Sequence, residues 1–323
     1  MINIPISVIM KLKKSKNVLI LGVGGGFDIF SGLPIYFTLE KMGINLHLAN
    51  FTNSNWENMN NYADIIPMAS SCVGVTGNIK QSSNNFPELF LASWFKEIKQ
   101  KDVNIWAFKR EQNVSEYSNS LNILVKHLSI DAILLVDGGV DSIMTGEEDG
   151  SGKMIEDTLT LAAVKNVDIP TKILACIGFG SELEDNISHY LALQNISTII
   201  KQGGFYGTCS LVDYMSSFKD YKEACIHVFN QPNHKKNDIQ TKIIPSCEGE
   251  FGDYHMYPEE KKMDVFLSPL TSMYWFFNAE AAIYNNKIIE AIEDKETFFD
   301  IVQTGVPIIK NFANRNRSHI PLT

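Results

Sequence analysis

Residues 17–43 read "NVLILGVGGGFDIFSGLPIYFTLEKMG" and contain three successive patterns that point to one fold class. The apolar run at 17–23 predicts a strand buried on both faces, which is typical of a parallel sheet. A helical spacing of apolar residues follows over 29–42, and Gly43 is placed to end that helix. A glycine-rich turn with one acid, Asp28, joins the two elements. The stretch therefore predicts an α/β fold.

The same alternation of strand and helix patterns continues along most of the chain. Further strands are predicted at 44–50, 103–108, 131–137, 171–179, 197–201 and 263–270. Helices are predicted at 86–98, 115–128, 154–166, 181–195 and 208–230, with a helical hairpin at 271–293. This order predicts a three-layer, Rossmann-like α/β fold, in which helices cover both faces of a mostly parallel sheet. We expect a single domain over 1–323, with a less regular excursion at about 231–262.

The composition argues against several classes of protein. The 323 residues are 45% hydrophobic and carry a formal net charge of −9 without a basic stripe, so nucleic acid is not an expected partner. No apolar run reaches the roughly 18 residues of a membrane span, and the N-terminal stretch lacks the charge order of a signal peptide. The five cysteines have no metal-ligand spacing and indicate a reducing compartment. We expect a cytoplasmic protein; non-classical secretion and the oligomeric state stay open.

The glycine turn after the first strand is a candidate anion-binding site. Its residues are Gly22, Gly24, Gly25, Gly26 and Phe27, with Asp28 at the start of the helix. Glycines let backbone N–H groups approach a phosphate, and a helix N-terminus adds partial positive charge. Phe27 replaces the third glycine of a dinucleotide fingerprint, and Asn50, a further candidate ligand contact, replaces the expected acid. A nicotinamide-dependent dehydrogenase is thus disfavoured, and a turn needed only for packing is the alternative.

Acidic residues follow the strongest strand pattern, 131–137. The candidate site residues here are Asp137, Gly138, Gly139, Asp141 and Ser142, and the further acids are Glu147, Glu148, Asp149 and Asp157. Closely spaced carboxylates bind hard cations such as Mg²⁺, or raise one another's pKa. Asp137 and Asp141 are therefore the expected ligands if the protein holds a metal ion, although no cofactor is required by the sequence. For 147–149 the alternative is a solvated acidic loop.

A second glycine-rich stretch, "KQGGFYGTCS", occupies 201–210. Its candidate ligand contacts are Gly203, Gly204, Phe205, Tyr206 and Gly207. Because both glycine stretches follow predicted strands and precede predicted helices, we expect them to form one cleft. A simple turn is the alternative. A further acidic loop at 247–253 contains Glu250 and Asp253, whereas HExxH and GxSxG motifs are absent from the sequence.

Several segments together resemble one family, the hypothetical proteins grouped as domain of unknown function 1152. They are "ILGVGGGFDIFSGLPIYFTLEKMG", "DAILLVDGGVDS", "GGFYG", "CEGEFGD" and "LSPLTSMYWFF", spread in this order over residues 19–277. This resemblance implies an α/β fold. More locally, "GGGFD" and "GGFYG" are similar to the catalytic and diphosphate loops of macrodomains, which bind ADP-ribose. That similarity implies a noncanonical macrodomain-like protein, with Gly24, Gly25, Gly26 and Asp28 at the distal ribose and Gly204, Phe205, Tyr206 and Gly207 around the diphosphate.

The expected function is binding of a nucleotide-sugar, most plausibly ADP-ribose, and hydrolysis of its ribosyl bond. Such cleavage passes through an oxocarbenium-like state, which needs a carboxylate; Asp28 is the first choice, then Asp141 and Asp137. The ligand would be a small molecule or an ADP-ribosylated protein. One alternative is a metal-assisted nucleotide or sugar-phosphate hydrolase built on Asp137 and Asp141. Another is a nucleotide-sensing module without turnover.

Overall fold

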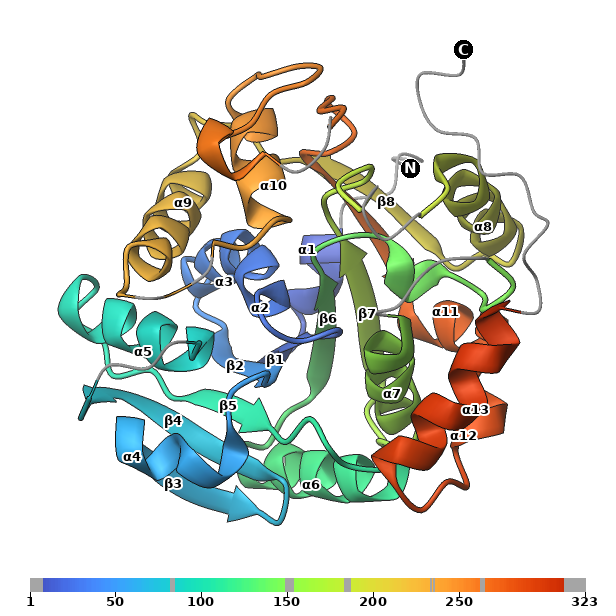
Figure 1. Ribbon diagram of the computed structural model, residues 1–323, viewed down its shortest axis with the longest axis horizontal. Helices are drawn as coiled ribbons and strands as arrows, with labels where there is room; N and C mark the ends of the chain where they lie inside the picture. The colour runs from blue at the N-terminus through green and yellow to red at the C-terminus, as the bar shows by residue number, and fades with distance from the viewer. Residues whose placement is uncertain are drawn as a thin grey trace.

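A mixed sheet forms the centre of the protein (Figure 1). The computed structural model describes residues 8–81, 85–148, 154–182, 187–232, 234, 236–261 and 265–310. Within these residues the sheet has nine strands in the order β3-β4-β5-β2-β1-β6-β7-β9-β8. The strands are β1 (Asn17–Gly22), β2 (Asn45–Phe51), β3 (Ala63–Ala69), β4 (Cys72–Ile79), β5 (Ile105–Phe108), β6 (Ala132–Asp137), β7 (Thr171–Cys176), β8 (Phe205–Ser210) and β9 (Met273–Asn278). The central strands β5, β2, β1, β6 and β7 are parallel. Antiparallel strands extend both edges.

Helices cover both faces of this sheet, so the predicted three-layer α/β architecture is confirmed (Figure 1). One face packs against α1 (Val8–Leu12), α2 (Asp28–Ser31), α3 (Leu33–Glu40), α5 (Pro87–Glu97), α9 (Ser216–Phe229) and α10 (Gln240–Cys247). The other packs against α6 (Val114–His127), α7 (Met154–Lys165), α8 (His189–Lys201), α11 (Ala279–Asn285), α12 (Ile289–Ile292) and α13 (Phe298–Lys310). The short helix α4 (Met59–Tyr62) precedes β3, and 3₁₀ turns lie at Trp56–Asn58, Asp141–Ile143 and Pro258–Glu260.

The central strands are apolar on both faces because each face has its own hydrophobic core. In β1, Ile20 belongs to the core under α3 and α5, whereas Leu19 and Leu21 belong to the core under α6 and α7. All three side chains are fully buried. Strand β1 pairs with β6 in parallel, with Gly22 opposite Val136. The loops that follow these two strands therefore begin side by side at the carboxyl edge of the sheet, before they lead to helices on opposite faces.

The secondary structure differs from the predictions mainly at the edges of the sheet. The hairpin of β3 and β4 occupies a stretch that was predicted to be irregular. Residues 197–201 were predicted as a short strand, but they form the end of α8, where Ile196 and Ile199 face the core three residues apart. The helices predicted at 208–230 and 271–293 were wrong at their starts, which form β8 and β9.

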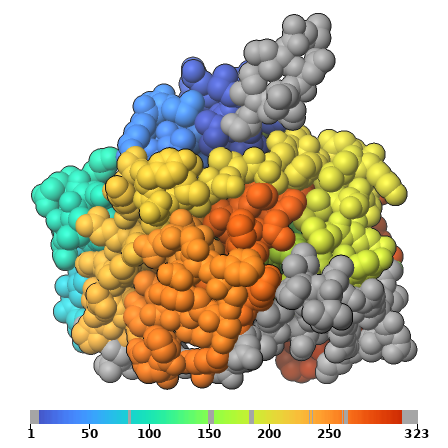
Figure 2. Space-filling model, turned by 90° about the horizontal axis from the view of Figure 1, so that it is seen from above, coloured from blue at the N-terminus to red at the C-terminus, as the bar shows by residue number. Residues whose placement is uncertain are grey.

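Part of the predicted excursion at 231–262 is a helix, α10, and the strand predicted at 263–270 lies partly outside the described residues. The described part, 265–270, contributes one isolated bridge, between Gly252 and Leu267. Figure 2 shows α10 and the segment after it as a continuous orange surface beside the yellow of α9. Among the described helices, none combines the length and the apolar content that a membrane crossing requires.

Candidate functional site

The carboxyl ends of β1 and β6 meet where the winding of the sheet reverses. From β1 the chain moves to β2 and β5 on one side, then returns past β1 to β6 and β7 on the other. Loops that leave neighbouring strands in opposite directions open a crevice, and open α/β sheets bind their ligands there. The loop after β1 carries the glycine turn, and the loop after β6 carries Asp137 and Asp141. The structure thus brings together two of the predicted clusters.

A cavity of about 300 Å³ opens at this crevice, a size suited to a small molecule. It is lined by Gly24, Gly25, Gly26, Phe27, Asp28, Asn53, Arg110, Asp137, Gly138, Asp141, Glu156, Asp157, Glu182, Asn237 and Ile239. Other predicted contacts, namely Gly22, Asn50, Gly139 and Ser142, belong to the same loops or to the end of β2 but do not line the cavity. They support its walls.

The glycine turn is held tightly against neighbouring groups. Gly25 has a φ of +89°, which favours glycine, and a Cβ there would overlap the carbonyl oxygen of Phe51. A Cβ on Gly24 would overlap a carboxylate oxygen of Asp157. Glycine at position 24 therefore lets the backbone approach an acidic side chain of α7. This close approach joins the turn to the carboxylates on the other side of the crevice.

Asp28 connects the two loops that form the crevice. Its carboxylate accepts hydrogen bonds from the backbone N–H of Gly24 (2.6 Å) and of Gly138 (3.2 Å). Asp28 is the first residue of α2, and the N-cap position is Phe27. Asp28 therefore does more than begin a helix, because this side chain also fixes the β6 loop against the glycine turn.

Three buried carboxylates lie together at the floor of the cavity. Asp137 ends β6, Asp141 begins the following 3₁₀ turn, and Asp157 lies in the first turn of α7. Their side chains are 2%, 4% and 2% exposed, and one oxygen from each lies within 4.8 Å of the other two. Burial, followed by the charges of Asp141 and Asp28, holds the pKa of Asp137 well above its ordinary value of 3.8. Burial and the charges of Asp141 and Asp137 do the same to the pKa of Asp157.

The repulsion among these carboxylates is large enough to require compensation. Two unit charges 4.8 Å apart repel each other by about 3.5 kcal/mol at an effective dielectric constant of about 20. With three pairs ionised, the total would approach the net stability of a typical folded domain, about 5–15 kcal/mol. The three groups must therefore share protons or bind a cation at neutral pH.

The donor set fits a hard divalent cation. Carboxylate oxygens are the ligands that Mg²⁺ and Ca²⁺ prefer. Asp157 Oδ2 is buried and has no hydrogen-bond partner within the described residues, an arrangement that is costly unless another group completes it. Asp137 is oriented by Ser142, whose backbone N–H (3.2 Å) and hydroxyl donate to its Oδ2. Such support fixes a ligand's direction.

Among the described residues that line the cavity, one side chain at the rim is positively charged, that of Arg110. Arg110 follows β5 and is half-exposed, and its guanidinium pairs with Glu156 of α7. On the opposite wall, a carboxylate oxygen of Glu182 accepts a hydrogen bond of 2.6 Å from the backbone N–H of Val140. The cavity is therefore acidic at its floor and carries one strong anion-binding group at its mouth.

Behind the glycine turn lies a buried polar pair, Asn50 and Glu88. The Asn50 amide donates to the carbonyl of Gly26 (2.9 Å) and to Glu88 Oε1 (2.8 Å). Burial raises the pKa of Glu88 to about 7, opposed by hydrogen bonds that include one with Asn50. Asn50 was predicted to touch a ligand; it is fully buried, and in the structure it holds the turn in place.

Sequence reasoning missed several members of the site. Asp157 was named among the further acids but not among the candidate site residues. Its position in the first turn of a helix directly after the acidic stretch could have indicated that it belongs to the site. Arg110 and Glu182 follow strands β5 and β7 and could have been found from the rule that carboxyl ends of parallel strands share an edge. Asn237 and Ile239 come from the excursion, for which no sequence signal existed. Asp149 lies outside the described residues.

The expectation that both glycine stretches form one cleft was wrong. Residues 205–210 form the edge strand β8, which runs antiparallel to β9, and β9 runs antiparallel to β7. Gly203 and Gly204 therefore precede β8 at the amino-terminal edge of the parallel strands, with Phe205 paired to Phe277. Gly25 lies at the carboxyl-terminal edge. Tyr206 lines a different cavity, and Gly207 lies within β8 itself.

The acidic loop at 247–253 is also separate from the carboxylate floor. Asp253 accepts from the Lys261 ammonium (2.6 Å) and pairs with His255 (3.0 Å). The Lys261 contact is the main cause that lowers the pKa of Asp253 to about 2. Glu250 follows α10 on the surface. Neither residue lines the cavity at the switch point.

Residues 19–305 match the family model described as protein of unknown function (DUF1152). The chain belongs to this family. The match covers most of the chain and includes the glycine turn, the three carboxylates and the sheet that positions them. No curated protein and no solved structure matches the chain. The similarity of two loops to those of macrodomains receives no support from these comparisons, so the function of this DUF1152 protein has to be argued from its site.

Proposed function

We propose that this protein is a divalent-cation-dependent hydrolase acting on a small phosphorylated substrate, such as a nucleotide or a sugar phosphate. One observation carries the proposal: three buried carboxylates converge within 4.8 Å of one another, and one of their oxygens has no partner within the described residues. This set, Asp137, Asp141 and Asp157, matches the oxygen donors of Mg²⁺ sites. The raised pKa values of Asp137 and Asp157 are expected of ligands without their ion.

A bound cation would supply a Lewis acid for a phosphoryl oxygen and lower the pKa of a coordinated water. The protein's own residues would then orient the substrate. Arg110 at the mouth pairs with Glu156, and it would turn from that carboxylate to the phosphate, because a guanidinium presents paired donors to phosphate oxygens. Asp28 keeps the glycine turn and the β6 loop together, so that the donors and the carboxylates keep their spacing during turnover.

The second candidate is hydrolysis of the ribosyl bond of a nucleotide-sugar such as ADP-ribose. The observation that favours it is the turn at Gly24, Gly25 and Gly26, which lies beside a carboxylate on the cavity wall. An oxocarbenium-like transition state would use such a carboxylate. The second candidate also relied on the loop at Gly204 to surround the diphosphate. Gly204 lies at the other edge of the sheet, so that loop no longer supports this candidate. A nucleotide-sensing module would use the same turn without turnover.

The decisive experiment is a product assay on nucleotides, sugar phosphates and ADP-ribosylated protein with Mg²⁺ or Mn²⁺, and with EDTA. Release of inorganic phosphate that requires the cation is the expected result. Release of free ADP-ribose would favour the second candidate. In the Asp141→Asn variant the cation-dependent rate should fall by about 10²-fold or more, whereas Asp168→Asn, an exposed acid beyond the end of α7, should leave it unchanged. Cation-independent turnover by Asp141→Asn would contradict the proposal.

A further inference from the structure

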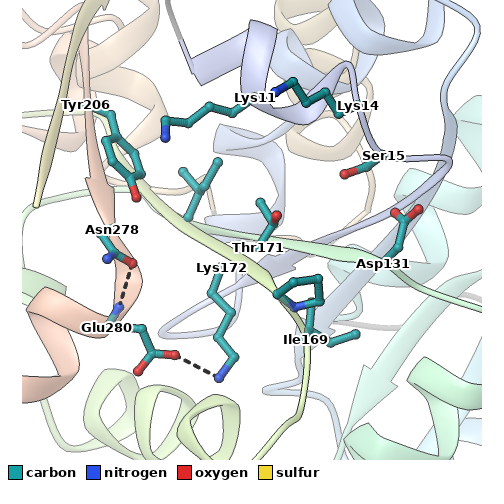
Figure 3. A pocket seen from close by; sticks show the side chains of 12 residues that line it. Lys11, Lys14, Ser15, Asp131, Ile169, Thr171, Lys172, Tyr206, Asn278 and Glu280 are labelled. Atoms are coloured by element: carbon teal, nitrogen blue, oxygen red, sulfur yellow. Dashed lines mark hydrogen bonds and ion pairs between the residues drawn. The ribbon is translucent and has the colours of Figure 1, made fainter.

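We propose that the amino-terminal edge of the sheet carries a second binding site, which takes a small phosphorylated and hydroxyl-bearing molecule such as a sugar phosphate. A cavity of about 530 Å³ lies there, between the turn after α1, the start of β7 and the end of β9 (Figure 3). Strand β7 begins at this cavity with Thr171 and ends at Cys176, beside Asp137. The cavity therefore lies at the opposite edge of the sheet from the carboxylate cluster.

The charge of this cavity is reversed relative to the rest of the protein. Three lysines line it against two carboxylates, in a chain of net charge −9. Both carboxylates are engaged: Asp131 accepts from the backbone N–H of Lys16 (2.8 Å) and of Asn17 (3.2 Å). Glu280 pairs with the buried Lys172 ammonium at 2.8 Å. With Lys172 paired to Glu280, the other two lysines outnumber the remaining carboxylate, Asp131, so the lining keeps a formal net charge of +1 that can attract an anion.

Those two lysines, Lys11 and Lys14, come from one turn of chain. The backbone N–H of Lys14 bonds to the carbonyl of Lys11 (3.3 Å), which places both side chains on the same side of the cavity (Figure 3). Within the described residues neither ammonium has an ion-pair partner. Lys11 Nζ lies 4.2 Å from the ring centroid of Tyr206, so a cation–π contact holds it over the cavity. A phosphate dianion bound in this cavity would be attracted by both ammonium groups.

The remaining wall offers hydrogen-bonding groups suited to a polyol. Ser15 and Thr171 bring hydroxyls, and the Tyr206 side chain and the Asn278 amide lie on the opposite side (Figure 3). Asn278 Oδ1 already accepts from the backbone N–H of Glu280 (3.3 Å). That bond fixes its amide orientation and leaves its NH₂ for a ligand. A cavity of about 530 Å³ exceeds the needs of inorganic phosphate and fits a sugar phosphate.

Calorimetric titration of the full chain with ribose 5-phosphate tests this proposal, with EDTA present so that no cation holds phosphate at the carboxylate cluster. Wild-type protein should bind ribose 5-phosphate and should not bind ribose. The double variant Lys11→Gln/Lys14→Gln should bind about tenfold more weakly or worse, because two charge contacts are lost. Lys13→Gln removes the same charge from an exposed neighbour outside the cavity, so it should bind within about twofold of wild type.

Equal binding by the double variant and by wild type would overturn the proposal, as would absence of binding by wild type. Loss of binding in Asp137→Asn would also overturn it, since the ligand would then be in the carboxylate site. All substituted lysines are exposed, so unchanged melting temperatures should accompany the binding data. The outcome is independent of the proposed hydrolase activity, which is measured with the cation present and through different residues.

Discussion

Replacing Asp157 with asparagine should stabilise the metal-free protein and remove its stabilisation by Mg²⁺. The Asp157 side chain is buried beside two other carboxylates, within 4.8 Å. At that distance each ionised neighbour opposes a charge on Asp157 by about 3.5 kcal/mol at an effective dielectric constant of about 20. Asparagine has nearly the same shape and no charge. Proton sharing relieves part of the repulsion in wild type, so a gain of about 1–2 kcal/mol is expected at neutral pH.

The pH dependence of this gain follows from the raised pKa values. Asp137 and Asp157 keep their protons in the folded state at pH values where the unfolded chain loses them, above about 3.8. The unfolded state therefore binds fewer protons, and the free energy of unfolding of the metal-free protein falls as the pH rises above that value. The advantage of Asp157→Asn should be small at about pH 4 and grow towards neutral pH.

Thermal unfolding in EDTA and in Mg²⁺ measures both effects. In EDTA at neutral pH, Asp157→Asn should melt about 2 °C or more above wild type. In Mg²⁺ the order should reverse, because the wild-type site binds the cation and gains stability by mass action. Asp168→Asn, exposed in the same part of the chain, should melt like wild type in both buffers. A lower melting temperature for Asp157→Asn in EDTA, with wild type unaffected by Mg²⁺, would show that the cluster neither suffers this repulsion nor binds a cation.

Three further outcomes follow from the site. Asp28→Asn should lose one of two charge-assisted hydrogen bonds to backbone N–H groups, which costs about 1.5–3 kcal/mol in denaturant unfolding; an unchanged stability would contradict its linking role. Arg110→Ala should raise KM for a phosphorylated substrate about 10-fold or more, with Lys109→Ala as control, and an unchanged KM would place the phosphate elsewhere. Glu88→Gln should remove a pH dependence of activity centred at about 7; persistence of that dependence would show that another group titrates.

The centre of the fold was predictable because its sequence signal is local. The run at β1 has buried residues on both faces of the sheet, and continuous apolar strands with intervening helices leave few arrangements other than a parallel sheet. The edges were not predictable in the same way. β9 reads "MYWFFN" after a turn, and only its pairing with β7 and β8 selects strand over helix.

In the candidate site, too, the residues that follow the parallel strands were predictable and the others were not. Asp28, Asp137 and Asp141 follow strands whose carboxyl ends share one edge, so the parallel sheet was sufficient to bring them together. The glycines at 203–207 looked equivalent, but 197–201 is the end of α8 and not a strand, so Gly203 and Gly204 precede β8, which runs parallel to β7, and lie at the amino-terminal edge. Asn50 illustrates a different limit: its place at a strand end was predicted, but only the packing of Glu88 behind it shows that it faces the loop.

Anomalous diffraction from Mn²⁺-soaked crystals tests most directly whether Asp137, Asp141 and Asp157 hold a divalent cation. Mn²⁺ accepts the same oxygen ligands as Mg²⁺ and gives a strong anomalous signal. We expect one peak among the three carboxylates, at about 2.0–2.3 Å from at least two of their oxygens, and loss of that peak in Asp157→Asn. Absence of any peak between the three carboxylates in saturating Mn²⁺ would show that the cluster does not hold a divalent cation.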